Sequence, residues 1–213
     1  ANINPYPYSY KTTVDIKTLV NNESMLNQKC RIAGRIISLR KMGKSMFVHI
    51  QDNQFKQQLY FHTDNLIEDQ YNLVAKKLDI GDIIGVAGEM FKTKLGEITM
   101  KACELSILSK CLHPLPNIKE KDGENFFSFD DKESRYRNRH IDFIVNPTRI
   151  KVFEKRALII KSIRSFLEKL DYLEVETPIL QPIYGGASAK PFTTHHNTLD
   201  EDLYLRIADE LYL

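Results

Sequence analysis

Apolar and polar side chains alternate through much of residues 31–108, and this period of two constrains the fold more than any other feature of the chain. Alternation over four to eight residues is typical of strands with one buried face. Five segments show it, and their ranges are 31–40, 46–52, 57–61, 83–91 and 97–108. A segment of helical period, residues 66–78, separates the third strand from the fourth.

Three strands, a helix and two more strands, with glycines where the strands must bend, is the element order of an OB-fold barrel. A chain of 213 residues that is 42% hydrophobic can supply such a core. We therefore predict a mostly β, α+β protein with a five-stranded OB-fold over residues 29–112. An N-terminal arm and a short helix at 14–21 occupy residues 1–28 before it.

The pattern changes after the barrel. Residues 113–145 combine proline, glycine and alternating charges, which predicts a linker followed by a bridging helix at 133–144. Residues 149–170 carry apolar side chains every three or four positions and predict the strongest helix of the chain. An extended strand is expected at 172–178, where Pro178 ends it.

Small residues at 185–189 begin the C-terminal part, where the backbone can pass close to a ligand. A strand, a turn and a returning strand are predicted next, at 192–194, 197–202 and 203–208. Glu210 follows this apolar run, so a carboxylate on a buried strand is expected to face a small cationic molecule. Because the run stops at Leu213, we expect the chain to be a piece of a longer protein.

Composition narrows the classes of protein. The net charge is only +2, so a nucleic-acid site must be a local patch and not a global basic field. The three cysteines form no C-x-x-C pair, which favours reduced thiols in a cytosolic protein over a disulfide framework or a zinc site. No apolar run approaches the length of a membrane span.

Aromatic and basic side chains recur on the predicted barrel. They are Phe47, Tyr60 and Phe91 with Arg31, Arg35, Arg40, Lys41 and Lys44. Single-stranded bases stack on aromatic rings, for about 1–3 kcal/mol per base, and cations hold the phosphates. Phe47 could instead be a core residue and the cations a solvated edge, and the residues alone leave both interpretations open.

Other chemistry-bearing residues favour structural roles. Arg135 and Arg139 share one helical face and could contact phosphate, but ion pairs in a bridging helix are favoured. Adjacent histidines such as His195 and His196 point to opposite faces of a strand, which disfavours a shared metal ion. Glu210 by itself is best explained as a structural acid.

Several motifs occur in a fixed order: Met42-Gly43-Lys44, Phe91-Lys92-Thr93-Lys94 with Gly96-Glu97, Arg135-Tyr136-Arg137, Glu174-Val175-Glu176-Thr177-Pro178, Gly185-Gly186-Ala187, and Leu205-Arg206-Ile207-Ala208 with Glu210-Leu211-Tyr212. Their order and spacing over nearly the whole chain resemble the lysyl-tRNA synthetase family of class II aminoacyl-tRNA synthetases. The Met-Gly-Lys turn is more similar to the bacterial branch.

The resemblance implies functional residues. Phe47 would stack on an anticodon base of tRNA(Lys), and Arg40, Gln58 and Glu97 would hydrogen-bond the bases. The backbone at Gly186 and the carboxylate of Glu210 would hold the substrate L-lysine. Residues 146–213 would begin the antiparallel catalytic domain, and their first part, motif 1, would form a homodimer interface.

The resemblance also implies a cytoplasmic ligase that uses ATP with Mg²⁺. The arginines of motifs 2 and 3 are expected beyond Leu213, so catalytic residues stay unassigned and this piece alone is expected to be inactive. Asp209 and Asp171 stand where the family usually has proline and glycine. A non-catalytic OB-fold RNA-binding protein with a synthetase remnant remains an alternative, and the aspartyl or asparaginyl relatives are disfavoured by the string at 185–192.

Overall fold

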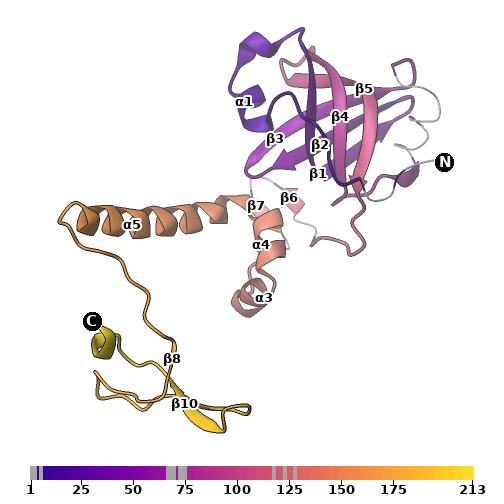
Figure 1. The fold of residues 1–213 in the computed structure, drawn as a ribbon. Coiled ribbons are helices and arrows are strands. Elements are labelled where there is room, and N and C mark those ends of the chain that lie inside the picture. Colours follow the sequence, from indigo (N-terminus) through magenta and orange to yellow (C-terminus); the bar gives the residue numbers. More distant parts are fainter. Residues whose placement is uncertain are drawn as a thin grey trace. The chain divides into compact units, whose positions relative to one another are not determined.

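The computed structural model describes residue 4 and residues 7–65, 71, 76–116, 119–121, 124–126 and 129–213. It divides into two compact units, residues 1–151 and residues 152–213. Figure 1 shows the elements of both units, and each unit is described by itself.

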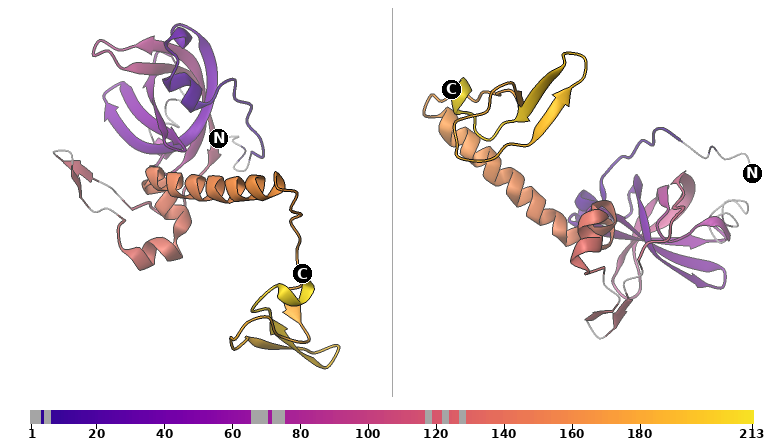
Figure 2. Two further views of the ribbon diagram at one scale, coloured as in Figure 1. Left: turned by 90° about the vertical axis from the view of Figure 1, so that its left-hand side faces the viewer. Right: turned by 90° about the horizontal axis from the view of Figure 1, so that it is seen from below.

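Five strands form a closed barrel in the order β1-β2-β3-β5-β4. Their bounds are β1 (Lys29–Met42), β2 (Ser45–Asp52), β3 (Phe55–His62), β4 (Ile83–Lys92) and β5 (Ile98–Ser109). β3 and β5 pair in parallel, and the other neighbours pair antiparallel. The five predicted strands and the OB-fold are therefore confirmed (Figures 1 and 2).

Inward-facing side chains of all five strands form the barrel core, and α1 (Ile16–Val20) covers one end of it. Ile16 and Leu19 are almost fully buried there. The short helix predicted at 14–21 is therefore confirmed. The N-cap carboxylate of Asp15 accepts a hydrogen bond from the Thr18 backbone N–H at 2.6 Å. Hydrogen bonding to Thr18 lowers the pKa of Asp15.

A β-bulge in β1 changes which side chains face outward. Ile36 pairs with Ile50 and both are buried, but the register shifts before Ser38, which pairs with His49. Without this extra residue, strict alternation would turn Arg40 into the core. After the bulge Leu39 packs against the core, and Arg40 lies exposed beside Phe47.

The predicted helix at 66–78 lies mostly outside the described residues. Tyr71, Lys76 and Lys77 are helical where they are described. Leu78 is buried and joins the core. The three cysteines, Cys30, Cys103 and Cys111, are free thiols, and burial raises the pKa of Cys30.

Two short helices replace the single bridging helix predicted at 133–144, so that prediction is wrong in this respect. After the short strands β6 (Lys119–Lys121) and β7 (Glu124–Phe126), the chain forms α3 (Lys132–Arg137) and α4 (Arg139–Val145). They are separated by Asn138, at φ −120° and ψ 56°. Its backbone N–H and side-chain amide both donate to the Ser134 carbonyl, which turns the chain out of α3.

Asp142 ties these two helices to the 3₁₀ turn Pro147–Arg149. Its carboxylate is fully buried and lies 3.3 Å from Arg135 Nε, 3.0 Å from Arg139 Nη1 and 3.6 Å from Arg149 Nε. The Asn146 amide donates to it at 3.1 Å. Arg135 and Arg139 therefore act as ion-pair partners within the connector, as favoured from the sequence.

The long predicted helix is present as α5 (Ile150–Glu168). The Asp171 and Tyr172 N–H groups donate to the Glu168 and Leu167 carbonyls, and Asp171 has φ +62°. This is a Schellman cap with aspartate at the left-handed position that glycine usually fills. The described part of the chain contains no helix whose length and hydropathy would suit a membrane span.

A small sheet of order β8-β10-β9 follows α5. Its strands are β8 (Leu180–Gln181), β9 (Thr193–His196) and β10 (Glu201–Leu205), and the chain then forms the 3₁₀ turn η3 (Glu210–Tyr212). The hairpin of β9 and β10 confirms the predicted strand, turn and return. The strand predicted at 172–178 is wrong, because these residues pair with no strand of the described chain.

Candidate nucleic-acid interface and amino-acid site

Four rings cluster on the outer face of the barrel, from β2, β3 and β4. The Tyr60 ring centroid lies 5.1 Å from that of Phe47, 6.0 Å from that of His62 and 6.1 Å from that of Phe91. Met46 and Val48 are fully buried on either side of Phe47, so Phe47 points outward and is half-buried. The alternative that Phe47 is a core residue is therefore wrong. We call these four rings the ring cluster.

Strand register arranges the rings and their polar neighbours in two rows. One row places Arg40 beside Phe47, and Phe47 beside Tyr60. The next row runs from Ser38 through His49 and Gln58 to Thr99. Apart from Thr99, which is fully buried, the residues of both rows face outward on one surface, which we call the ring face.

Gln58 and Glu97 are positioned by hydrogen bonds at this surface. The Gln58 amide donates to Thr99 Oγ1 at 2.8 Å. The Glu97 backbone N–H donates to Thr93 Oγ1 at 3.0 Å in the turn between β4 and β5, and the Glu97 side chain is exposed. The structure thus brings Arg40, Phe47, Gln58 and Glu97 onto the ring face.

Two of the predicted basic residues do not belong to the ring face. Arg31 pairs with β4, and its guanidinium lies 4.9 Å from the centre of the Tyr10 ring. Arg35 donates from Nη1 to the Gly81 carbonyl at 2.7 Å. Both precede the bulge in β1, so their part of the strand faces different neighbours, and their inclusion in the patch was wrong.

The sequence interpretation missed Ser38, His49 and His62 as members of the ring face. Alternation along 46–52 already puts His49 on the side of Phe47, and that signal could have found it. The orientation of Ser38 depends on the bulge and carried no such signal.

Buried charge elsewhere in the barrel is fully paired. Asp82 is completely buried, accepts a hydrogen bond from the Cys111 N–H at 2.8 Å, and forms an ion pair with Lys110. Burial would lower the pKa of Lys110, but hydrogen bonds to Asp79 and Asp82 outweigh it and raise this pKa. The cluster joins the end of β5 to the loop before β4, which is a structural role.

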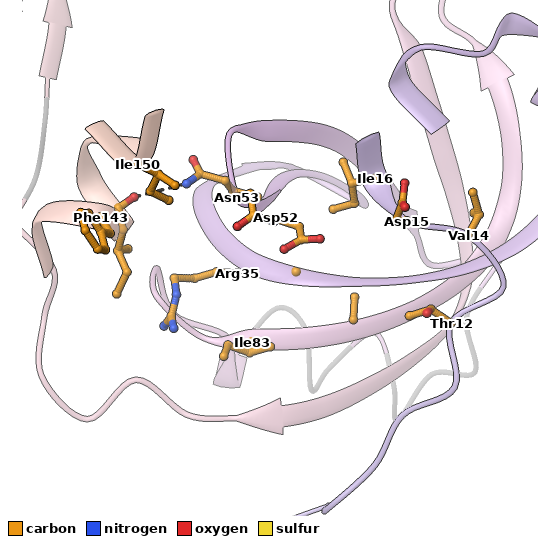
Figure 3. A pocket seen from close by; sticks show the side chains of 14 residues that line it. Thr12, Val14, Asp15, Ile16, Arg35, Asp52, Asn53, Ile83, Phe143 and Ile150 are labelled. Atoms are coloured by element: carbon orange, nitrogen blue, oxygen red, sulfur yellow. Dashed lines mark hydrogen bonds between the residues drawn. The ribbon is translucent and has the colours of Figure 1, made fainter. Parts of the chain in front are cut away.

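A groove of about 480 Å³ lies at the other end of β2 (Figure 3). Asp15 and Ile16 line it from the N-terminal segment, Arg35 and Asp52 from the barrel, and Phe143 from α4. The Gln51 amide donates to the Ile144 carbonyl at 3.3 Å and links the barrel to the connector here. We assign the groove to packing between these elements.

Gly186 and Glu210 lie against each other in the second unit. Gly186 has φ +83°, and a Cβ atom added to it would lie 2.9 Å from Glu210 Oε2. The structure therefore brings together the two residues predicted for the amino-acid site. However, Glu210 is exposed and lies in η3, so its placement on a buried strand was wrong. The return strand ends at Leu205, before this turn.

Asp209 anchors the start of this turn as its N-cap residue. Arg206 Nη1 lies 3.0 Å from Asp209 Oδ1 and donates to the Thr177 carbonyl at 2.8 Å. The Thr177 hydroxyl also hydrogen-bonds Asp209. These three residues help to line a cavity of about 370 Å³, so Asp209 fixes the local backbone before Glu210.

The two adjacent histidines have separate partners. His195 lies 2.9 Å from Asp202 and 3.4 Å from Asp200, whereas His196 Nδ1 accepts from the Leu199 N–H at 3.2 Å. Over the described ranges, no three side chains of His, Cys, Asp or Glu gather as a metal site.

Two family models match parts of the chain. Residues 30–108 match the OB-fold nucleic acid binding domain, described as tRNA anti-codon, and residues 131–213 match the class II tRNA synthetases (D, K and N). The chain is also 48% identical to a lysine–tRNA ligase of Porphyromonas gingivalis strain W83 and to that of strain ATCC 33277. Each alignment covers 99% of this chain and 38% of the relative.

Proposed function

The chain belongs to the lysine–tRNA ligase branch of the class II tRNA synthetases, and we propose that it supplies the anticodon-binding domain and the first part of the catalytic domain of such an enzyme. It spans about 38% of the length of the curated relatives that it matches. The complete enzyme would activate L-lysine with ATP in the cytoplasm and transfer it to the 3′ end of tRNA(Lys).

The ring face is the observation that carries this proposal. Phe47, flanked by Tyr60 at 5.1 Å between ring centroids, offers a surface on which an unpaired base can stack. Arg40 can hold a phosphate or a base edge, and Gln58 and Glu97 offer an amide and a carboxylate. A uracil edge carries both a donor and acceptors, so these groups suit a uridine-rich anticodon.

Gly186 and Glu210 are proposed to bind the substrate lysine. A left-handed glycine lets the backbone approach the ligand, and a Cβ there would meet Glu210 Oε2 at 2.9 Å. The Glu210 carboxylate can pair with an ammonium group of lysine. These contacts would hold the amino acid in place for reaction.

The proposed reaction has two steps. The lysine carboxylate attacks the α-phosphate of ATP, forming the lysyl-adenylate as pyrophosphate leaves. A terminal ribose hydroxyl of the tRNA then attacks the lysyl carbonyl, and AMP leaves. The residues of this chain contribute by positioning lysine and tRNA.

Mg²⁺ commonly accompanies ATP in such reactions and neutralises phosphate charge. The described residues bring no three metal-ligating side chains together, so we assign no Mg²⁺ ligand to this chain. Glu210 and Asp209 are adjacent, but Asp209 is already paired with Arg206 at 3.0 Å.

Homodimer formation through α5 is the proposed assembly. Large apolar side chains of this helix lie exposed: Val152, Leu158, Ile159, Ile163 and Phe166. Apolar area of this kind on one helix is typical of an interaction surface. This supports the role of residues 149–178 as motif 1.

The substitution Phe47→Ala tests the proposal at its central residue. Loss of the ring should weaken binding of the chain to tRNA(Lys) by about 1–3 kcal/mol, because one base loses its stacking partner. Fluorescence anisotropy with labelled tRNA would measure the dissociation constant.

Two control variants should keep the wild-type affinity. Phe47→Tyr retains the ring, and Tyr8→Ala removes a fully exposed ring outside the ring face. Equal affinities of Phe47→Ala and the wild type would refute the proposed stacking role. Thermal melting of each variant would show that the barrel is folded.

A further inference from the structure

His49 occupies the centre of the ring face, although neither the motifs nor the family resemblance gives it a role. Its side chain is 35% exposed. Nδ1 lies 2.9 Å from Ser38 Oγ on β1, and Nε2 lies 3.6 Å from Glu97 Oε1 in the turn between β4 and β5. His49 is also the direct register partner of Gln58 on β3. One ring therefore connects three elements that carry proposed base-binding residues.

The partners of the imidazole determine what it can do. With a neutral ring, the Ser38 hydroxyl can donate to Nδ1, which leaves the N–H at Nε2 directed toward the Glu97 carboxylate. At 3.6 Å this contact is longer than a good hydrogen bond, so a neutral ring holds Glu97 weakly. A protonated ring adds full charge attraction and restricts the otherwise exposed carboxylate.

We propose that His49 is a positioning residue for base recognition, which holds Glu97 at the ring face and tightens RNA binding when the imidazole is protonated. The inference rests on the proposed function of this face as an anticodon-binding surface. Glu97 has a second carboxylate oxygen, which can accept from a base while the first faces His49. Fixing the carboxylate beforehand reduces the entropy that binding would otherwise cost.

Other charged or titratable groups face His49 from each neighbouring strand. Arg40 lies two residues from Ser38 on β1, Lys56 and Tyr60 lie two residues from Gln58 on β3, and Lys101 on β5 pairs with Tyr60. Of these residue types, only histidine ordinarily changes its charge between about pH 5 and 8. His62 lies at the other end of the face, where it contacts Asp64 at 3.4 Å.

The test measures how pH changes the affinity for an RNA stem-loop with a UUU anticodon. Fluorescence anisotropy at constant ionic strength would give dissociation constants between about pH 5.5 and 8 for the wild type, His49→Gln, Glu97→Gln and His62→Gln. We expect the wild type to bind about 2- to 5-fold more tightly at the acidic end. His49→Gln and Glu97→Gln should both lose most of this dependence, and His62→Gln should retain it.

Each outcome separates the explanations. If Glu97→Gln keeps the pH dependence, His49 acts only as a cation for phosphate, and the positioning role is overturned. If His49→Gln keeps it, the inference is also overturned, although binding itself leaves the proposed function standing. If no variant and no wild-type sample binds the stem-loop at any pH, the anticodon-binding function fails and the inference fails with it. His49→Thr is a second substitution at the same position, and a melting curve of each variant would show whether it is folded.

Discussion

The barrel buries many of its apolar side chains, whereas the second unit leaves its apolar side chains exposed or half-buried. Among the described residues, every buried apolar side chain lies between Ile16 and Leu105, and none lies in 152–213. In the second unit only Gln181 is buried, and its Oε1 has no hydrogen-bond partner. The barrel therefore stabilises itself, whereas the described contacts of the second unit supply little hydrophobic stabilisation.

The difference follows from how each region pairs its backbone. Successive antiparallel neighbours and the parallel pair of β3 with β5 close the barrel, so it encloses its own core. The second unit has one long helix and a small sheet of three short strands, and short strands bury little area. A region can thus contain regular helices and strands without enclosing a hydrophobic core.

Removing a ring from the barrel core should give the largest effect. Phe61 is fully buried, so Phe61→Ala should lower the free energy of unfolding by about 3–5 kcal/mol. Ile160→Ala on the exposed α5 should change it by less than about 0.5 kcal/mol. Urea denaturation followed by circular dichroism would measure both, and equal costs would abolish the contrast between the two regions.

The connector offers a test of buried charge, with a matched surface pair. Asp142→Asn leaves Arg135, Arg139 and Arg149 without their fully buried carboxylate and should destabilise the first unit by about 3 kcal/mol. Glu133→Gln removes an exposed partner of Arg137, 2.8 Å away, and should cost less than about 0.5 kcal/mol. A small loss in Asp142→Asn would mean that the arginines find other partners.

Asp171→Gly should stabilise the C-terminal end of α5, which belongs to the unit without a buried apolar core. Asp171 has φ +62°, and glycine adopts this conformation without the steric cost of about 1 kcal/mol that other residues bear. Slower amide exchange at Tyr172 would report the gain. Asp171→Ala keeps a side chain in the left-handed region and should show no such slowing.

Acid should loosen the helix caps of the first unit, which is the smallest effect. Hydrogen bonds to Ser134 hold the pKa of Asp131, the N-cap of α3, below 3.8. Since the folded-state pKa is lowered, the stabilisation is present above about pH 3.8 and is lost as the pH falls through the folded value. Protection of the Ser134 amide against hydrogen exchange should therefore fall as the pH drops below about 3.8. Asp131→Asn should keep the cap and show no such loss of protection.

Much of the fold and part of the site could be predicted from the residues. Alternation around Phe47 and Phe61 located strands, and the three-to-four-residue spacing of 149–170 located α5, because both periods depend on local geometry. The break at Asn138 could not be predicted, since it depends on two hydrogen bonds to one carbonyl. The turn that exposes Glu210 was also missed, because contacts among Thr177, Arg206 and Asp209 precede it.

By itself, the sequence determined the order of the five barrel strands and the position of α5, and it named Arg40, Phe47, Gln58 and Glu97 as well as Gly186 and Glu210. The tertiary structure decided which side chains share a surface. The bulge before Ser38 is the clearest case: one extra residue turns Leu39 inward and Arg40 outward, toward Phe47. The pairing of β1 with β2 sets that shift, and a single strand's pattern cannot contain it because register belongs to two strands.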